Sequence, residues 1–165
     1  MNKKFFSIFV IVLALIGLAG IYSIQPSREN FEDLFEMNVP HGQHFKDIAY
    51  CLPNGGLGCT KEFWDVNSDC EIDNGDIVVY YYDDSYLVEG ESDAWQHALN
   101  ALTTSYFYEP YQKQGNLVIL TNDLESGSIP PYIVGAHNDD GSKVVFVGGY
   151  NLNDLIGYAN SLKFK

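Results

Sequence analysis

Basic residues are scarce in this sequence. Of its 165 residues, 9 are Lys or Arg and 22 are Asp or Glu, so the formal net charge is −13. No Lys or Arg occurs between Glu62 and Gln112. A surface of this sign repels nucleic acid phosphates and anionic lipid headgroups. The charge therefore argues against binding to DNA or RNA, while acidity by itself indicates nothing beyond solubility.

Several catalytic signatures are missing as well. The three cysteines form no Cys-x-x-Cys motif, which argues against dithiol redox chemistry. No Gly-x-Ser-x-Gly motif is present. A helix would bring Asp93 and His97 onto one face, yet no nucleophile accompanies them. The sequence therefore favours a non-catalytic protein over an enzyme.

One long hydrophobic run stands near the start of the chain. Lys3 and Lys4 precede Phe5 to Ile24, a stretch without any charged residue. About 20 apolar residues can span a bilayer, whereas the core of a cleaved signal peptide is shorter. No good small-x-small cleavage site or lipobox cysteine follows. We expect residues 1–24 to be an uncleaved signal anchor with a cytoplasmic N-terminus, and secretion after signal cleavage is the alternative.

The remainder has the length of one domain. All 22 acidic residues follow the hydrophobic run, as expected of a part that lies outside the membrane. Residues 25–30 are polar and predict a short tether. Residues 31–165 predict a single extracytoplasmic acidic domain, in which three cysteines indicate one disulfide and one thiol. Cys51 and Cys59 bracket a turn-rich loop and are the preferred pair, with Cys70 as an alternative partner.

Residue patterns in this domain predict several strands and two helices. Ile77 to Tyr82, which is β-branched and aromatic throughout, is the strongest strand signal. Apolar residues at three- and four-residue steps predict a helix after Ser92 and another from Leu152 to Leu162. Strands cluster, and Asn138 to Gly141 predicts a hairpin turn. The order favours an α+β fold with a mostly antiparallel sheet of about five or six strands and both helices on one face.

Two stretches resemble known proteins. Pro130-Pro-Tyr-Ile-Val, Asp140-Gly-Ser-Lys-Val-Val-Phe-Val-Gly-Gly149 and the helix behind it resemble the second half of a thioredoxin-like fold, which implies parallel pairing in the central sheet. No Cys-x-x-Cys accompanies this pattern. The lysines with the anchor, the Val-Pro-x-Gly-x-x-Phe stretch from Val39 to Phe45, the tyrosine-rich strand and the final Gly-Ser-Lys-Val-Val-Phe-Val-Gly-Gly together resemble small membrane-anchored proteins of methanogenic archaea, whose function is unknown.

An acidic stretch has the spacing of a calcium-binding loop. In the twelve residues DVNSDCEIDNGD, oxygen-bearing side chains occupy the positions that supply ligands in such loops. The opening Asp-Val-Asn-x-Asp and the final Asp resemble a dockerin half-repeat. The predicted calcium ligands are Asp65, Asn67, Asp69, Glu71, Asp73 and Asp76.

Two features of this loop disagree with calcium binding. Cys70 stands at the sixth position, where the sharp turn calls for Gly. Ile77 to Tyr82 favours a strand, although an exit helix should begin there. The alternative interpretation is an acidic surface turn that leads into a strand and holds no cofactor.

The aromatic residues suggest a partner. Along a strand, Tyr81 faces opposite to Tyr80 and Tyr82, so one set can pack in the core while the other is exposed. Exposed aromatics among carboxylates are common in surfaces that bind carbohydrate or protein. The alternative is that long strands are simply rich in Tyr. From the predicted anchor, the acidity and the lack of a catalytic set, we expect a membrane-anchored extracytoplasmic domain that binds a carbohydrate or protein partner or has a structural role in the envelope. The alternatives are a calcium-dependent binding module and a degenerate thioredoxin-like or hydrolytic enzyme.

Overall fold

The computed structural model describes residues 26–46, 60–123 and 129–165. Its strands are β1 (Ser27–Phe31), β2 (Phe35–Val39), β3 (Gln43–Phe45), β4 (Thr60–Asp65), β5 (Ile77–Asp83), β6 (Glu109–Gln114), β7 (Leu117–Thr121), β8 (Tyr132–His137), β9 (Lys143–Gly149) and β10 (Lys163–Phe164). Its helical segments are the 3-10 turn η2 (Asp84–Tyr86), α2 (Ala94–Asn100), the π-helical turn η3 (Ala101–Ser105) and α3 (Leu152–Asn160).

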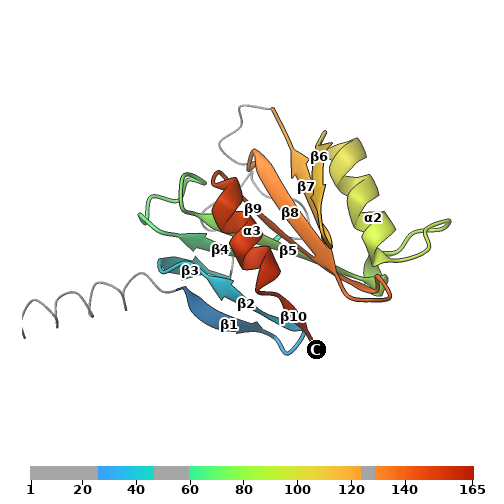
Figure 1. The fold of residues 1–165 in the computed structure, drawn as a ribbon, viewed down its shortest axis with the longest axis horizontal. Helices are drawn as coiled ribbons and strands as arrows, with labels where there is room; N and C mark the ends of the chain where they lie inside the picture. The colour runs from blue at the N-terminus through green and yellow to red at the C-terminus, as the bar shows by residue number, and fades with distance from the viewer. Residues whose placement is uncertain (1–25, 47–59, 124–128) are drawn as a thin grey trace, which may run out of the picture.

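The strands form two sheets (Figure 1). The larger sheet has seven strands in the order β3-β4-β5-β9-β8-β7-β6, and each neighbouring pair is antiparallel. The smaller sheet has three strands in the order β1-β2-β10. The predicted α+β fold with a mostly antiparallel sheet is confirmed at this level, but the structure has more strands than the predicted five or six. The thioredoxin-like alternative is wrong for this sheet, because it requires parallel pairing.

Strand β5 lies inside the larger sheet and is buried on both faces. The side chains of Tyr80, Tyr81 and Tyr82 are each at most 2% exposed. Tyr80 and Tyr82 pack in one core, and Tyr81 packs in the other. The interpretation that one set of these tyrosines reaches the surface is therefore wrong, and the alternative, a strand that is simply rich in Tyr, agrees with their burial. A strand covered on both faces has a continuous apolar sequence, which is the pattern that Ile77 to Tyr82 shows.

The two helices cover opposite faces of the larger sheet, which corrects the prediction that they share one face. Ala94 and Ala98 of α2 and Leu102 of η3 pack in the same core as Phe146. Leu155 and Ala159 of α3 pack with the other core, which also includes the buried side chains of β1 and β2. The smaller sheet and α3 therefore cover one face together. Since β9 alternates its side chains between two cores, each core needs its own cover.

Strand β1 replaces most of the predicted tether. Residues 27–30 pair with β2 in a regular antiparallel register, from Ser27 opposite Val39 to Phe31 opposite Phe35. Arg28 Nε lies 3.0 Å from Glu36 Oε2 across this pair. The polar sequence of β1 suits an edge strand with one exposed side, so its composition resembled that of a linker. In the described part of the chain, no helix is long and apolar enough to cross a membrane, and the predicted anchor at residues 1–24 lies outside that part.

Candidate ligand-binding cleft

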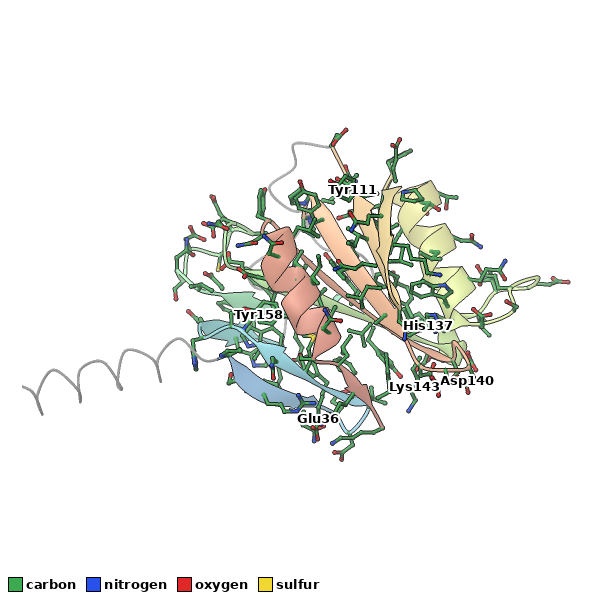
Figure 2. All side chains as sticks on the ribbon, viewed as in Figure 1. Glu36, Tyr111, His137, Asp140, Lys143 and Tyr158 are labelled. Carbon is green, nitrogen blue, oxygen red and sulfur yellow. The ribbon has the colours of Figure 1, made fainter. Side chains whose placement is uncertain are left out.

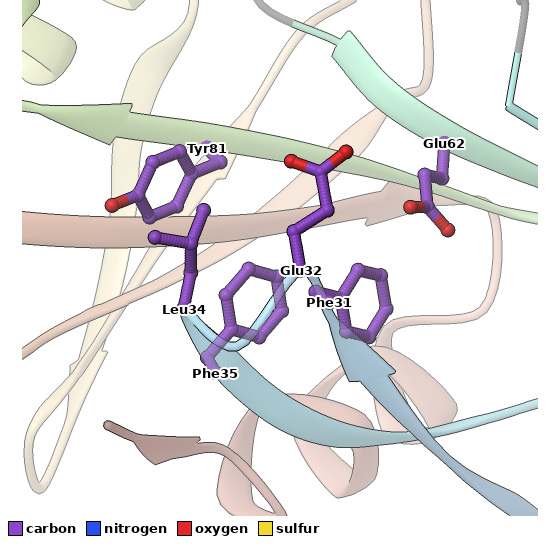
Figure 3. A pocket seen from close by; sticks show the side chains of 6 residues that line it. All are labelled: Phe31, Glu32, Leu34, Phe35, Glu62 and Tyr81. Carbon is purple, nitrogen blue, oxygen red and sulfur yellow. The ribbon is translucent and has the colours of Figure 1, made fainter.

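A small pocket lies beneath the turn that joins β1 and β2. Figure 3 shows the carboxylates of Glu32 and Glu62 and the ring of Tyr81 around it, together with apolar side chains of the turn. Its volume is about 10 Å³, and one water needs roughly 10–15 Å³ measured in this way. The pocket can therefore hold about one water and no larger ligand.

A larger cleft lies on the α2 face of the sheet. Its volume is about 310 Å³, which is near the lower end of the range of roughly 300–1,000 Å³ for small-molecule sites. The wall residues come from α2, from the β6–β7 hairpin and from the end of β8 with the turn that follows it. They are Trp95, Leu99, Lys113, Gly115, Asn116, Val118, His137, Asn138 and Asp139. Figure 2 labels His137 beside that turn.

The first turn of α2 contacts the chain turn between β8 and β9. Asp93 caps α2 by accepting hydrogen bonds from Gln96 N at 2.8 Å and Ser92 Oγ at 2.7 Å. The bond from Ser92, together with that from the Gln96 amide, lowers the pKa of Asp93 below its usual value. Trp95 N also donates to the carbonyl oxygen of Gly141 at 3.2 Å. The N-cap of α2 is therefore Asp93, one residue after Ser92. The cap holds the first turn of the helix, which carries Trp95.

The floor of the cleft is aromatic. The indole of Trp95 stacks on Phe146 with ring centroids 5.6 Å apart and an angle of 4° between the planes. His137 approaches the indole with a centroid distance of 4.6 Å. A Cβ atom at Gly135 would lie 2.1 Å from Cε1 of Phe146. Gly135 therefore leaves the space that Phe146 needs in order to support Trp95.

The rim of the cleft is polar. Lys113 pairs with Val118 across the hairpin, is exposed, and has no carboxylate within ion-pair distance among the described residues. His137 Nδ1 lies 2.6 Å from the carbonyl oxygen of Asn138. Asn116 and Asp139 are exposed, so an amide and a carboxylate remain accessible on the rim. The cleft thus combines the partly exposed ring of Trp95 with hydrogen-bonding groups of both kinds and one cation.

The acidic loop from Asp65 to Asp76 has a different geometry. The carboxylate of Asp65, which is 0% exposed, accepts hydrogen bonds from the amides of Ser68, Asp69 and Cys70. Asp76, which is 2% exposed, accepts from Val66 N at 2.7 Å and from Asp73 N at 3.1 Å. The carboxylates at both ends of the loop therefore bind its own backbone.

Its other predicted ligands contact one another. Asn67 Nδ2 donates to Asp69 Oδ2 and Asp73 Oδ2, each at 2.9 Å, and Glu71 is exposed. Burial raises the pKa of Asp76, and the nearby charges of Asp73 and Asp65 raise it further. Within the described ranges, no group of three or more His, Cys, Asp or Glu side chains is arranged to hold a metal ion.

The sharp turn of this loop forms without Gly. Cys70 has a φ of +64° and Ser68 has a φ of +65°, which is the left-handed region that favours Gly. Cys70 is also disulfide-bonded, and a covalent link helps to hold a residue in that conformation. Cys51 and Cys59, the preferred pair, lie outside the described residues. The structure thus shows a disulfide at the cysteine that was the alternative partner.

His97 and His44 each contact a glutamate. His97 Nδ1 lies 2.6 Å from Glu91 Oε2, so its partner is Glu91, while Asp93 caps the helix. His44 Nε2 lies 2.5 Å from Glu62 Oε2, and its ring stacks on Trp64. The expected Asp93–His97 pair is therefore wrong. His97 contacts Glu91 and Cys70 is disulfide-bonded, so the two side chains have separate partners.

Comparison with known proteins adds no further constraint. No family model, no curated protein and no solved structure matches the chain. The resemblance to anchored proteins of methanogenic archaea therefore stays a prediction. The candidate site rests on its geometry.

Proposed function

We propose that this protein is a membrane-anchored extracytoplasmic binding domain whose cleft beside α2 takes a sugar unit of an envelope glycan. The observation that carries the proposal is the cleft of about 310 Å³ with Trp95 on its floor and a polar rim. The uncharged run from Phe5 to Ile24 supports the anchor. An acidic domain that anionic headgroups repel needs such an anchor in order to stay at a membrane.

The chemistry of the cleft suits a sugar better than a wholly apolar ligand. One face of a sugar ring carries C–H groups that can lie on a flat indole, and its hydroxyls require donors and acceptors at the edge. Trp95 supplies the first kind of surface. Asn116 and Asp139 supply the second, and Lys113 can donate to a hydroxyl or pair with an acidic substituent.

The test is a titration of the full chain with neutral and acidic monosaccharides and with oligosaccharides, followed by tryptophan fluorescence and calorimetry. We expect Trp95→Ala to abolish binding and Asn116→Ala to weaken it. Because Asn116 is exposed, this second variant should fold normally even if loss of Trp95 disturbs the floor. Phe107→Ala is the matched control, since Phe107 is 67% exposed and does not line the cleft. Equal binding by all four chains would contradict the proposal.

A calcium-dependent role of the acidic loop is the second candidate. The observation in its favour is that Cys70 adopts the positive φ that a calcium loop requires at its sixth position. Binding would require Asp65 and Asp76 to turn from backbone amides toward the ion. We expect a higher Tm in millimolar calcium than in EDTA, with the shift lost in Asp69→Ala and kept in Asp140→Ala. An unchanged Tm of the parent chain would reject this candidate.

A further inference from the structure

Besides the small pocket and the cleft, another hollow lies at the opposite end of the molecule from the cleft. Its volume is about 500 Å³. It is bordered by the residue before β1, the turn between β2 and β3, the acidic loop and α3. The lining residues are Pro26, Pro40, His41, Val66, Gly75, Asp154 and Tyr158. We call this surface the basal groove.

The chain enters the folded domain at the basal groove. The predicted anchor ends at Ile24, and Pro26 already lines the groove. Two extended residues span at most about 7 Å. Each headgroup layer of a bilayer is roughly 5–8 Å thick. If the run ends where the hydrocarbon ends, Pro26 therefore lies at the level of the headgroups.

Strand β1 begins close to the end of the predicted anchor and is firmly held in the domain. β1 begins at Ser27 and pairs with β2 along its whole length. Arg28 adds hydrogen bonds to Glu36 Oε2 at 3.0 Å and to the carbonyl oxygen of Ser161 at 3.3 Å, which ties β1 to the end of α3. A long tether would let any face of the domain meet the membrane, whereas only Gln25 and Pro26 separate this strand from the predicted anchor.

We propose that the basal groove faces the bilayer and contacts its lipid headgroups. This inference rests on the proposed anchor. The side chains around the groove fit that position, because Val66 is 46% exposed and Tyr158 is half-buried on α3. Tyr is enriched at membrane interfaces, where its ring meets the acyl boundary and its hydroxyl meets water. The exposed carboxylate of Asp154, which lines the groove, keeps the surface at headgroup depth, since burial of a charge in hydrocarbon is costly.

The same orientation directs the cleft away from the membrane. β5 and β9 run antiparallel, with Val78 opposite Gly148 near the acidic loop and Asp83 opposite Lys143 near the turn that lines the cleft. In Figure 2, Tyr158 of the groove and His137 of the cleft are well separated. The groove also lies on the α3 side and the cleft on the α2 side. The ligand site would therefore open toward envelope glycans.

The test is site-specific photocrosslinking of the full chain in phosphatidylcholine vesicles. The photoreactive residue p-benzoylphenylalanine replaces Val66 in one variant and Asn116, on the rim of the cleft, in the matched control. Both positions are exposed, so each replacement should leave the fold intact. We expect lipid adducts by mass spectrometry at position 66, several-fold above those at position 116. Vesicle flotation of the full chain, beside a chain that lacks residues 1–24, measures the anchor separately.

Flotation tests the anchor, and the lipid adducts test the orientation of the domain. If the chain floats with vesicles and position 66 gives no more lipid adduct than position 116, the orientation is wrong and the anchor stands. If the full chain does not float, the anchor and the orientation are both wrong, while sugar binding at the cleft can still be measured. Flotation together with adducts confined to position 66 supports both.

Discussion

The acidic loop and the cleft are the two candidate sites. The predicted ligands of the loop are close together in the sequence, whereas the residues of the cleft are brought together only by the fold. The loop from Asp65 to Asp76 has a recognisable spacing, but Asp65 and Asp76 accept hydrogen bonds from the backbone of the same loop. The cleft has no recognisable spacing. Trp95, Lys113 and His137 come from three separate segments and surround about 310 Å³ of open space.

This difference shows what each kind of polar residue does for the fold. The buried carboxylates of the loop satisfy amides that would otherwise lack partners, so the fold itself needs them. The rim residues Lys113 and Asn116 are exposed. Removal of a loop carboxylate should therefore cost folding free energy, and removal of a rim residue should not. The variants below test this contrast, beginning with the support of the cleft.

The largest effect is expected for Phe146→Ala, which breaks the cleft floor. Phe146 is 0% exposed and stacks on Trp95. Truncation of a buried Phe costs about 3–5 kcal/mol of unfolding free energy, because apolar contacts are lost and a cavity remains. Phe146→Leu keeps most of the volume and should cost less than about 1.5 kcal/mol. Urea unfolding at neutral pH measures both.

A small loss in Phe146→Ala would show that Trp95 and its neighbours fill the space. Gly135→Ala serves as the independent check, because its Cβ would meet the Phe146 ring at 2.1 Å. Overpacking of this kind costs roughly 1–3 kcal/mol.

The next effect is expected for Asp65→Ala, which removes the acceptor at the centre of the loop. Three backbone amides in part-buried hydrogen bonds lose their acceptor, and we expect a loss of about 2 kcal/mol of unfolding free energy, within the range for leaving polar groups without a partner. Asp65→Asn keeps one acceptor oxygen but places an amide group against Cys70 N, so its loss should be about half as large. Equal stability of all three chains in urea unfolding would show that the carboxylate does not organise the loop.

Sequence patterns predicted the elements whose conformation follows from their own side chains. Ile77 to Tyr82 was predicted as a strand and forms most of β5, and the turn at Asn138 to Gly141 joins β8 to β9. The first strand was missed because an edge strand of polar residues depends on backbone pairing with β2. The placement of the helices was also missed, since the spacing of apolar residues along a helix does not say which face of a sheet it covers.

The cleft could not be read from the sequence for a related reason. Trp95 and His137 meet because β9, β8 and β7 are neighbours in the sheet, and that order is a property of the whole fold. One signal was present. Lys113 is the single Lys or Arg between Glu62 and Ser142, and a lone cation in so acidic a stretch marks a position to examine.

A smaller effect is expected for Asp93→Ala, which removes the cap that positions Trp95. Loss of an N-cap costs about 1 kcal/mol. The hydrogen bonds from Ser92 and Gln96 hold the pKa of Asp93 in the folded protein below its usual value. The stabilising effect of Asp93 is therefore complete above the unfolded pKa and disappears as the pH falls through the folded pKa. Asp93→Ala should therefore differ from the parent at neutral pH and converge with it in acid. Asp93→Asn should stay close to the parent at neutral pH.

The smallest effect on folding is expected for Lys113→Ala, and it separates the two kinds of site. Lys113 is exposed and has no ion pair among the described residues, so its removal should change the free energy of unfolding by less than about 0.5 kcal/mol. Binding of an acidic sugar should weaken because its counter-charge is lost, while binding of a neutral sugar should change less. Lys163→Ala, an exposed lysine on β10, controls for net charge. Equal weakening by both variants would mean that long-range charge, and not a contact within the cleft, attracts the ligand.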